Sequence, residues 1–146
     1  MDKYDLLKIS NQLCFPIYAC ANEILKLYKP VLDGLDLTYT QYIVMLALWE
    51  KDNVHEKDIG KILHLDSGTL APVIKRLCAK GYIRKTRSQA DERHVLLSVT
   101  ELGAELKERA VEVPKKVGSC VSMEQKDAET LFLLINKLLA SFSNNQ

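Results

Sequence analysis

The sequence predicts a mostly α-helical protein with one small β-hairpin, an α+β chain of 146 residues. Three observations lead to this prediction. Apolar residues recur at three- to four-residue steps through most of the chain, which is the period of amphipathic helices. Two short segments near the middle instead alternate apolar and polar residues, as half-buried strands do. The apolar content of 47% is enough for a core without disulfides or metals, since a chain of this size buries roughly 70% of its unfolded surface.

The first third of the chain predicts a long helix over about residues 5–32. Apolar residues recur from Leu6 to Tyr28 at helical spacing, and Pro30 followed by Asp33-Gly34 ends the pattern. Pro16 interrupts the helix, because its ring clashes with the carbonyl group four residues earlier. Either the helix kinks there, or it begins near Cys14 with Pro16 in its first turn.

The middle of the chain predicts three shorter helices. Residues 40–50 are strongly apolar and predict a helix buried on most sides. Residues 56–63 form a second helix, and a turn at 64–66 leads into a third that Gly81 stops. Pro72 fits this third helix if the start lies late enough to put it in the first turn. Three residues can cap its N-terminus: Asp66, Ser67 and Thr69.

A hairpin and two more helices complete the predicted fold. Residues 82–87 and 94–99 read as strands around a polar turn, and a helix follows from Thr100 to about Val113, where Pro114 ends or bends it. A last helix runs from about Ser122 to Phe142. A helix-turn-helix followed by a β-hairpin is the winged-helix plan, here over about residues 40–100 of a single domain 1–146. The terminal helices, about 5–32 and 101–142, carry more apolar surface than this small core needs.

Positive charge is concentrated in one segment of the chain. Residues 75–94 hold seven cations and two anions, a net charge of +5, which leaves −4 for the remainder. This distribution is typical of a local contact with nucleic acid. A helix-turn-helix inserts the start of its second helix into the major groove. The alternative is an ordinary helical hairpin with a solvated charged face. The candidate DNA-contacting residues here are Ser67, Gly68, Thr69, Pro72, Lys75 and Arg76.

The hairpin tip predicts a second DNA contact. Asp91 precedes Arg93 by two residues, so its carboxylate can orient the guanidinium through a two-pronged ion pair. An oriented arginine suits a narrow minor groove, where the negative potential is strongest. Arg87, at the end of the first strand, adds charge beside it. The alternative is a solvated turn with a weak surface ion pair.

Two of these segments resemble a known family. The run Leu65-Asp66-Ser67-Gly68-Thr69-Leu70, together with Asp91-Glu92-Arg93, is similar to the multiple-antibiotic-resistance regulator (MarR) family. The similarity extends over nearly the whole chain. It implies a homodimeric winged-helix repressor whose first and last helices intertwine, with a pseudo-palindromic double-stranded DNA operator as its partner.

The N-terminal cysteine segment resembles one branch of that family, the organic hydroperoxide resistance regulators (OhrR). The resemblance implies that Cys14 is the peroxide sensor, with Tyr28 and Tyr39 of the partner subunit as hydrogen-bond donors and Tyr18 nearby. Pro16 departs from the branch, in which an aliphatic or small residue is usual at this place. Three segments carry the resemblance: Gln12-Leu13-Cys14-Phe15-Pro16-Ile17-Tyr18, Tyr28-Lys29-Pro30 and Leu37-Thr38-Tyr39.

The chemistry expected of Cys14 follows from its surroundings. The thiolate is the species that attacks a peroxide, and a helix N-terminus and tyrosine hydroxyls both stabilise negative charge on sulfur. Apolar neighbours such as Phe15 favour organic hydroperoxides over small polar oxidants. The alternative for Cys14 is a packed core thiol, the commoner fate of a free cysteine.

The other three cysteines have different expected roles. Cys20 and Cys78 fall on apolar helix faces and are expected in the core. Cys120 follows Gly118-Ser119 in a predicted loop and is a candidate resolving cysteine, because the OhrR branch includes members with one in the C-terminal region. The alternative is an incidental loop thiol.

These observations lead to one functional hypothesis with three rivals. We expect a cytoplasmic repressor, not an enzyme, that releases its operator when an organic hydroperoxide oxidises Cys14, with no cofactor and no metal. The charged N-terminus predicts no secretory signal, and the longest apolar run, residues 42–49, is too short to span a bilayer. The rivals are a repressor released by a non-covalent phenolic or lipophilic ligand, a thiol peroxidase, and a winged-helix protein–protein adaptor.

Overall fold

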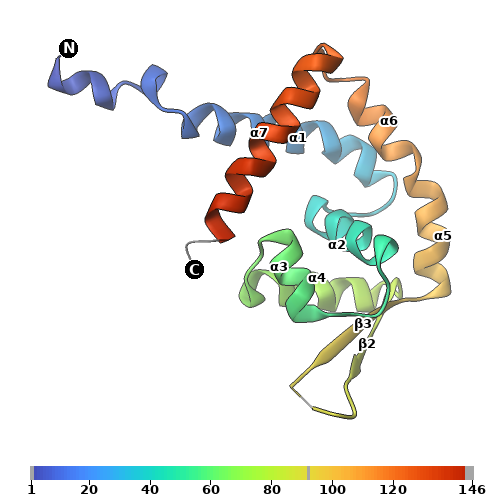
Figure 1. Ribbon diagram of the computed structural model, residues 1–146. Helices are drawn as coiled ribbons and strands as arrows, with labels where there is room; N and C mark the ends of the chain where they lie inside the picture. Colours follow the sequence, from blue (N-terminus) through green and yellow to red (C-terminus); the bar gives the residue numbers. More distant parts are fainter. Residues whose placement is uncertain (1, 92, 144–146) are drawn as a thin grey trace.

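The computed structural model describes residues 2–91 and 93–143 and confirms a mostly α-helical fold with a small antiparallel sheet (Figure 1). The 3-10 helices are η1 (Lys3–Leu7) and η2 (Ile9–Asn11). The α-helices are α1 (Cys14–Asp33), α2 (Tyr39–Glu50), α3 (Glu56–Leu63), α4 (Ser67–Ala79), α5 (Glu101–Ala110), α6 (Glu112–Gly118) and α7 (Gln125–Ser143). The strands are β1 (Val54–His55), β2 (Ile83–Arg87) and β3 (Val95–Val99).

The start of α1 differs from the predicted helix over residues 5–32. Residues 3–7 and 9–11 form the two short 3-10 helices, and the α-helix begins only at Cys14. Pro16 is the third residue of α1, where its missing N–H would have no partner within the helix. The prediction of α-helix for residues 5–13 is therefore wrong, and the alternative of a start near Cys14 is confirmed.

Helix α2 lies at the centre of the hydrophobic core. Thr38 and Gln41 form a reciprocal capping box at its start, which satisfies two of the free N–H groups there. Val44, Met45 and Leu48 are fully buried, as the apolar sequence of this helix predicts. The buried side chains packed around α2 come from α3, α4 and the sheet: Ile59, Leu70, Ile74, Leu77, Ile83 and Leu97.

Helix α4 begins too early for Pro72 to lie in its first turn. Asp66 caps the helix, so Ser67 is its first residue and Pro72 its sixth. Pro72 therefore lies in the second turn, and the expectation that it sits in the first turn is wrong. The pyrrolidine nitrogen cannot donate, so the Gly68 carbonyl lacks its regular donor four residues on.

The sheet has the order β1-β3-β2 and forms the wing. Strands β2 and β3 pair antiparallel from Ile83 opposite Val99 to Arg87 opposite Val95. Val54 of β1 pairs with Leu97 of β3, so a third short strand closes the base of the hairpin. Sequence reasoning missed β1, because two residues show no alternation and the pairing partner lies more than 40 residues away.

The helix predicted from Thr100 to about Val113 is bent and continues further. Thr100 caps α5, the regular helix stops at Ala110, and α6 continues beyond Pro114 to Gly118. Proline at position 114 removes the bond to the Ala110 carbonyl, so the chain bends there without ending. Near the start of α5, a side chain on Gly103 would collide with the carbonyl oxygen of Tyr82. Only glycine allows this close approach of α5 to the sheet.

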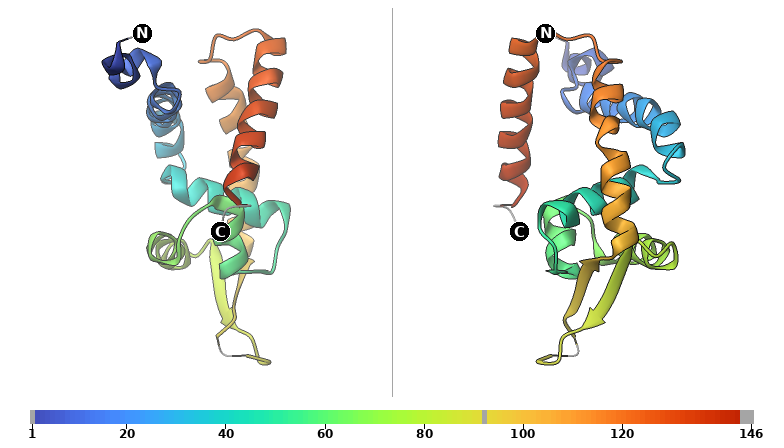
Figure 2. Two further views of the ribbon diagram at one scale, coloured as in Figure 1. Left: turned by 60° about the vertical axis from the view of Figure 1, so that its left-hand side comes forward. Right: turned by 90° about the vertical axis from the view of Figure 1, so that its right-hand side faces the viewer.

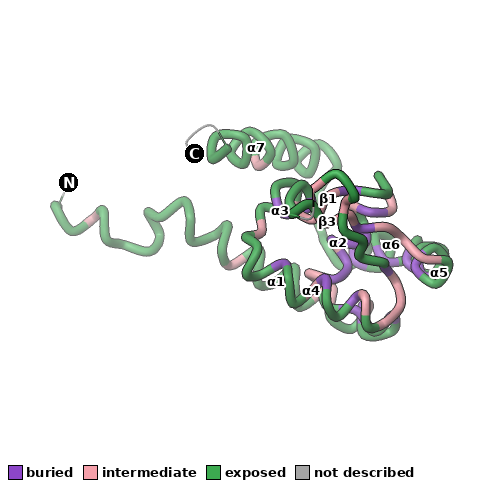
Figure 3. Tube along the Cα trace, turned by 90° about the horizontal axis from the view of Figure 1, so that it is seen from below, coloured by how far each residue is buried: buried purple, intermediate pink, exposed green. Residues whose placement is uncertain are grey.

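Helix α7 and the N-terminal half of α1 stand apart from this core (Figures 2 and 3). Among the described residues, α7 buries none, and α1 buries only Leu32, close to its C-terminal end. Within residues 2–91 and 93–143, no helix is both long and apolar enough to cross a membrane. The terminal helices nonetheless expose large apolar side chains, among them Leu7, Leu13, Phe15, Phe132, Leu133 and Leu134.

Candidate nucleic-acid interface and redox site

The start of α4 presents small polar groups on the surface. The Asp66 carboxylate accepts hydrogen bonds from the backbone nitrogen of Thr69 at 2.8 Å and from its hydroxyl at 3.2 Å. These bonds lower the pKa of Asp66 below its ordinary value. The Thr69 hydroxyl proton is thus engaged by the cap, whereas the neighbouring Ser67 and Gly68 are exposed at the helix tip.

The remaining candidate DNA contacts of α4 share its exposed side. Pro72, Lys75 and Arg76 are exposed, while Leu70 and Ile74 face the core. Helix α4 and the wing both lie at the end of the molecule opposite α1 (Figure 1). The structure therefore gathers the basic segment of the sequence at one end.

The wing tip is organised around Asp91. Its carboxylate accepts from the Arg93 backbone nitrogen at 3.0 Å and lies 3.7 Å from the Arg93 Nε and 3.4 Å from the His94 ring. The Arg93 guanidinium makes a single contact with Asp91 instead of the expected two-pronged one, because the same carboxylate also contacts the Arg93 backbone nitrogen and the His94 ring. The Arg93 side chain is 93% exposed. Arg87 is exposed as well, and Glu92, in the middle of the motif, lies outside the described residues.

Three tyrosines cluster where α1 meets α2. The rings of Tyr28 and Tyr39 meet edge to face with centroids 4.9 Å apart, and Tyr42 lies 5.8 Å from Tyr28. Burial, and then the neighbouring Tyr28, raise the pKa of Tyr39; burial is also the main cause of the raised pKa of Tyr42. Both hydroxyls therefore keep their protons at neutral pH and can donate. Sequence reasoning missed Tyr42, which looked like one more apolar position of α2.

Cys14 lies far from this tyrosine cluster within one chain. It is the first residue of α1, exposed, at an end that no side chain caps, so the sulfur sits at the positive end of the helix dipole. Tyr18 follows one turn later and is 67% exposed. Tyr28 lies fourteen positions after Cys14 on α1, which corresponds to about 21 Å along the helix axis. One chain does not bring the sensor candidate and its expected donors together.

The other cysteines differ in exposure. Cys20 is exposed on α1, so its prediction as a core residue is wrong for the single chain, because nothing in that chain covers this part of α1. Cys78 packs against the core, and burial raises the pKa of its thiol. Cys120 is exposed in the turn after α6, with its sulfur 3.4 Å from the Lys116 carbonyl oxygen.

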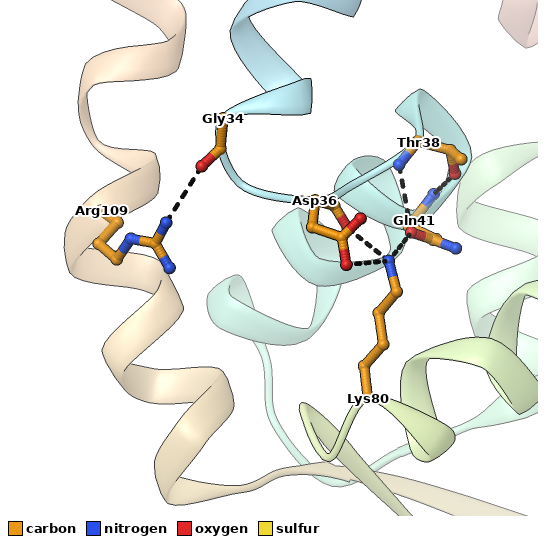
Figure 4. Close-up of polar contacts among 6 residues, drawn as sticks. All are labelled: Gly34, Asp36, Thr38, Gln41, Lys80 and Arg109. Carbon is orange, nitrogen blue, oxygen red and sulfur yellow. Dashed lines mark hydrogen bonds and ion pairs between the residues drawn. The ribbon is translucent and has the colours of Figure 1, made fainter.

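A polar cluster that the sequence did not reveal joins α1, α2, α4 and α5 (Figure 4). Lys80, at the end of α4, contacts Asp36 and the buried Gln41, and Arg109 of α5 donates to the Gly34 carbonyl at 3.1 Å. These partners lie 39 to 75 residues apart in the sequence. No local pattern could have linked them.

Acidic, histidine and cysteine side chains do not gather into a metal site. Across the part of the chain that the structure describes, no group of three or more of them could hold a metal ion.

The helix-turn-helix, the exposed start of α4 and the basic wing define a winged-helix transcriptional regulator. The sequence model of the family "Transcriptional regulator SarA/Rot" matches residues 26–110. The chain is 47% identical over 130 residues to the "Organic hydroperoxide resistance transcriptional regulator" of Bacillus subtilis, covering 89% of this chain and 86% of that protein. The chain therefore belongs to the MarR family of transcriptional regulators, in its organic hydroperoxide resistance branch.

Solved structures of a relative, AbfR of Staphylococcus epidermidis, share the fold. Reduced AbfR bound to DNA superposes with a TM-score of 0.82 at 29% identity, covering 99% of this chain and 98% of that one. The disulfide-formed AbfR gives a TM-score of 0.62 at the same identity, covering 97% and 94%. The conformation described here is therefore nearer to the reduced, DNA-bound form than to the disulfide form.

Proposed function

We infer that this protein is a homodimeric, DNA-binding transcriptional repressor that senses organic hydroperoxides through a reactive cysteine and then releases its operator. The observation that carries this inference is the 47% identity, over 89% of the chain, to a regulator of organic hydroperoxide resistance. The structure adds a fold suited to reading DNA and a cysteine at a helix N-terminus.

The dimer is supported by the apolar faces of the terminal helices. Leu13 and Phe15 of the N-terminal region and Leu133 of α7 are 73%, 44% and 69% exposed in the single chain. Large contiguous apolar surfaces of this kind mark protein interfaces. A two-fold axis relating two copies would present two α4 helices to DNA, so the operator is proposed to be pseudo-palindromic, with half-sites about 10 bp apart.

DNA reading is assigned to the start of α4 and to the wing. Ser67, Gly68, Thr69 and Pro72 are proposed to line the major groove, where the exposed Ser67 hydroxyl can donate to or accept from base edges. Lys75 and Arg76 follow along the same helix and are proposed to contact phosphates or a guanine. At the wing tip, Asp91 positions the backbone of Arg93, and Arg93 and Arg87 are proposed to contact the minor groove and its phosphates.

The sensor is proposed to be completed across the dimer. Cys14 cannot reach its own chain's Tyr28, so the donors to its sulfur are Tyr28 and Tyr39 of the partner subunit, with Tyr18 of its own helix nearby. The thiolate attacks one oxygen of the hydroperoxide, the O–O bond breaks, and the alkoxide takes a proton to leave as an alcohol. Sulfur is oxidised by two electrons to the sulfenic acid, and the peroxide is reduced by two.

The sulfenic acid is proposed to react next with a second thiol. Condensation forms an S–S bond and releases water, and Cys120 is the candidate partner, since its sulfur is exposed in a turn at the end of α6. A small external thiol would give the same chemistry. Either product changes the packing of the terminal helices and so the spacing of the two α4 helices.

The relatives are transcriptional regulators. We therefore propose that Cys14 acts once per oxidation event and not as the centre of a turnover enzyme. A regulator acts where its operator is, so the proposed location is the cytoplasm. No cofactor is needed for this cycle.

The test is an operator titration with reduced protein before and after one equivalent of an organic hydroperoxide, read alongside intact mass. The wild-type chain should lose affinity and gain one oxygen or one disulfide, with Cys14 modified first. Cys14→Ser should bind the operator normally and ignore the oxidant. Cys20→Ser is the matched control, since this cysteine is exposed on the same helix, and it should respond like the wild type.

The opposite results separate the rival functions. Release of Cys14→Ser by hydroperoxide would contradict the sensor assignment and favour the ligand-released repressor. Repeated consumption of hydroperoxide in the presence of a thiol reductant, faster than one event per chain, would favour the peroxidase. Absence of operator binding would favour the adaptor.

A further inference from the structure

We propose that Lys80 is the positioning residue that couples the tyrosine cluster to the DNA-reading helix. This inference rests on the proposed function, because it concerns how a change at the tyrosines reaches α4. Lys80 lies at the junction of α4 and the sheet, and its side chain extends to the loop between α1 and α2, residues 34–38 (Figure 4).

The Lys80 ammonium is held by three acceptors. It donates to the Asp36 backbone carbonyl and to the Gln41 Oε1 at 3.2 Å, and it lies 3.4 Å from the Asp36 carboxylate. Two of its three donors therefore make hydrogen bonds to this loop and the start of α2, and the Asp36 carboxylate adds an ion pair. A three-point contact fixes position as well as distance, unlike a surface ion pair.

The contact with Gln41 is shielded from water, whereas the ion pair with Asp36 is not. The Lys80 side chain is 28% exposed and that of Asp36 87% exposed. Gln41 is 3% exposed, the single polar residue buried within the described part of the chain. Exposed ion pairs such as Lys29–Asp33, at 75% and 61%, are screened by solvent and contribute little. Loss of Lys80 would remove one of the two donors to the buried Gln41 Oε1, so the two groups are expected to move together.

Gln41 connects Lys80 directly to the tyrosines. Its Oε1 also accepts from the Thr38 backbone nitrogen at 3.1 Å and thereby fixes the first turn of α2. Tyr39 is the first residue of that turn and packs on Tyr28. A displacement of Tyr39 therefore moves the groups that hold Lys80.

At its other end, Lys80 belongs to the reading helix. It is the C-cap of α4, and its backbone nitrogen donates to the Arg76 carbonyl at 3.0 Å. Helix α4 is continuous from Ser67 to Ala79, so a shift at its C-terminus is expected to displace Ser67 at the opposite end. Besides the packing of α2 on α4, one path from Tyr39 to the DNA groove thus runs through the Lys80 side chain.

The chain contains a matched control for this role. Arg109 of α5 donates to the Gly34 carbonyl of the same loop at 3.1 Å, but it lies on a helix that does not read DNA. Lys80→Met and Arg109→Met each remove a cationic tie to the loop and keep an apolar stem. Both should lower the midpoint of thermal unfolding, so that measurement alone does not distinguish coupling from stability.

The distinguishing measurement is the ratio of operator affinities of reduced and Cys14-oxidised protein, with oxidation followed by intact mass. Wild-type and Arg109→Met proteins should show the full ratio. Lys80→Met should be oxidised at the wild-type rate, yet its ratio should fall by at least about fivefold, the lower end of the coupling usual between linked sites. Lys80→Arg, which keeps the charge and several donors, should retain most of the ratio.

Other results would overturn the inference. If Lys80→Met kept the same ratio as Arg109→Met, the coupling would not pass through this side chain. If Lys80→Met is too unstable to titrate, Lys80→Gln gives the same test, because it removes the ammonium charge and shortens the side chain but keeps a polar end. Failure of the proposed function is seen separately, since the wild-type protein would then keep its operator after Cys14 oxidation.

Discussion

The winged-helix body, residues 39–110, and the terminal helices, α1 and α7, differ in how they satisfy their apolar side chains. In the body, α2 is surrounded by α3, α4 and the sheet, and side chains such as Leu48 are wholly buried. In α7, within the described residues, no side chain is buried, although its sequence is as amphipathic as that of α4 in the body. The same helical pattern therefore describes a core in one region and an interface in the other.

This difference explains why the sensor candidate looks incomplete. The tyrosine cluster lies in the packed region, where the C-terminal half of α1 meets the winged-helix body. Cys14 lies in the region that the single chain leaves uncovered, at the exposed start of α1. A single chain separates them by about 21 Å of helix, so in the proposed function the second chain of the dimer completes the redox site.

The largest expected effect is the loss of the dimer when one of the terminal helices is removed. Ending the chain before Ser122 deletes α7, and starting it at Ile24 deletes the exposed half of α1. Each truncation should halve the mass seen in sedimentation, because the interface has no other source of apolar area. The helix content of the body should persist. An unchanged dimer for both truncations would contradict the assignment of these helices.

A pair of leucine substitutions sharpens the same contrast. Leu48→Ala should lower the free energy of unfolding by about 2–5 kcal/mol, since it leaves a cavity in the core. Leu133→Ala, at a position 69% exposed in the single chain, should instead weaken the dimer. Thermal unfolding at two protein concentrations distinguishes them. The Leu133 effect should grow on dilution, and an equal loss at both concentrations would argue against an interface there.

A smaller effect is expected from the exposed tip of the body. Arg93→Ala should weaken operator binding by about 1–3 kcal/mol, as for loss of a positioned arginine, with no change in thermal unfolding. Operator affinity should also fall steeply with salt, with a slope of about −0.9 per neutralised phosphate. Arg109→Ala, distant from the wing, is the control. Unchanged affinity of Arg93→Ala at fixed salt would contradict a DNA-reading wing.

The smallest effect concerns the cap of α4. Asp66→Ala removes the acceptor for two groups of Thr69 and should lower the midpoint of thermal unfolding modestly at neutral pH. The folded pKa of Asp66 lies below its unfolded value, near 4, so its contribution is complete above that pH and disappears as the pH falls through the folded pKa. The gap between variant and wild type should therefore close in acid. A difference in unfolding midpoint that grows in acid would contradict a lowered pKa of Asp66 in the folded protein.

Local patterns in the sequence predicted the elements whose causes are local. The pair α3–α4, the strands β2 and β3 and the Thr100 cap follow from periodicity and capping residues within a few positions. The choice between a kinked α1 and a later start was open, since Pro16 allows both, and only the structure settles it. The two-residue β1, and the contact of Lys80 with Gln41, depend on pairing across the fold that no window of sequence contains.

In the candidate sites, charge and motif predicted the DNA-reading side chains, whereas the redox residues came from the family resemblance. The side chains proposed to read DNA are exposed at one end, as the charge distribution led us to expect. The orientation of Arg93 was not predictable, because Asp91 divides its carboxylate among three groups. Cys20 was misjudged for a related reason: an apolar helix face does not reveal whether its cover comes from the same chain.

The placement of the two terminal helices also sets an order of events during synthesis. Residues 34–124 separate α1 from α7, so α1 leaves the ribosome roughly 5–20 s before α7 at usual elongation rates. During that interval the apolar start of α1 has neither of its eventual neighbours. If the redox site is completed across the dimer as proposed, nascent chains carry Cys14 without its tyrosine donors, and the response to oxidant is acquired only after release and dimerisation. Newly synthesised chains and mature dimers should thus differ in how fast Cys14 reacts with the same oxidant.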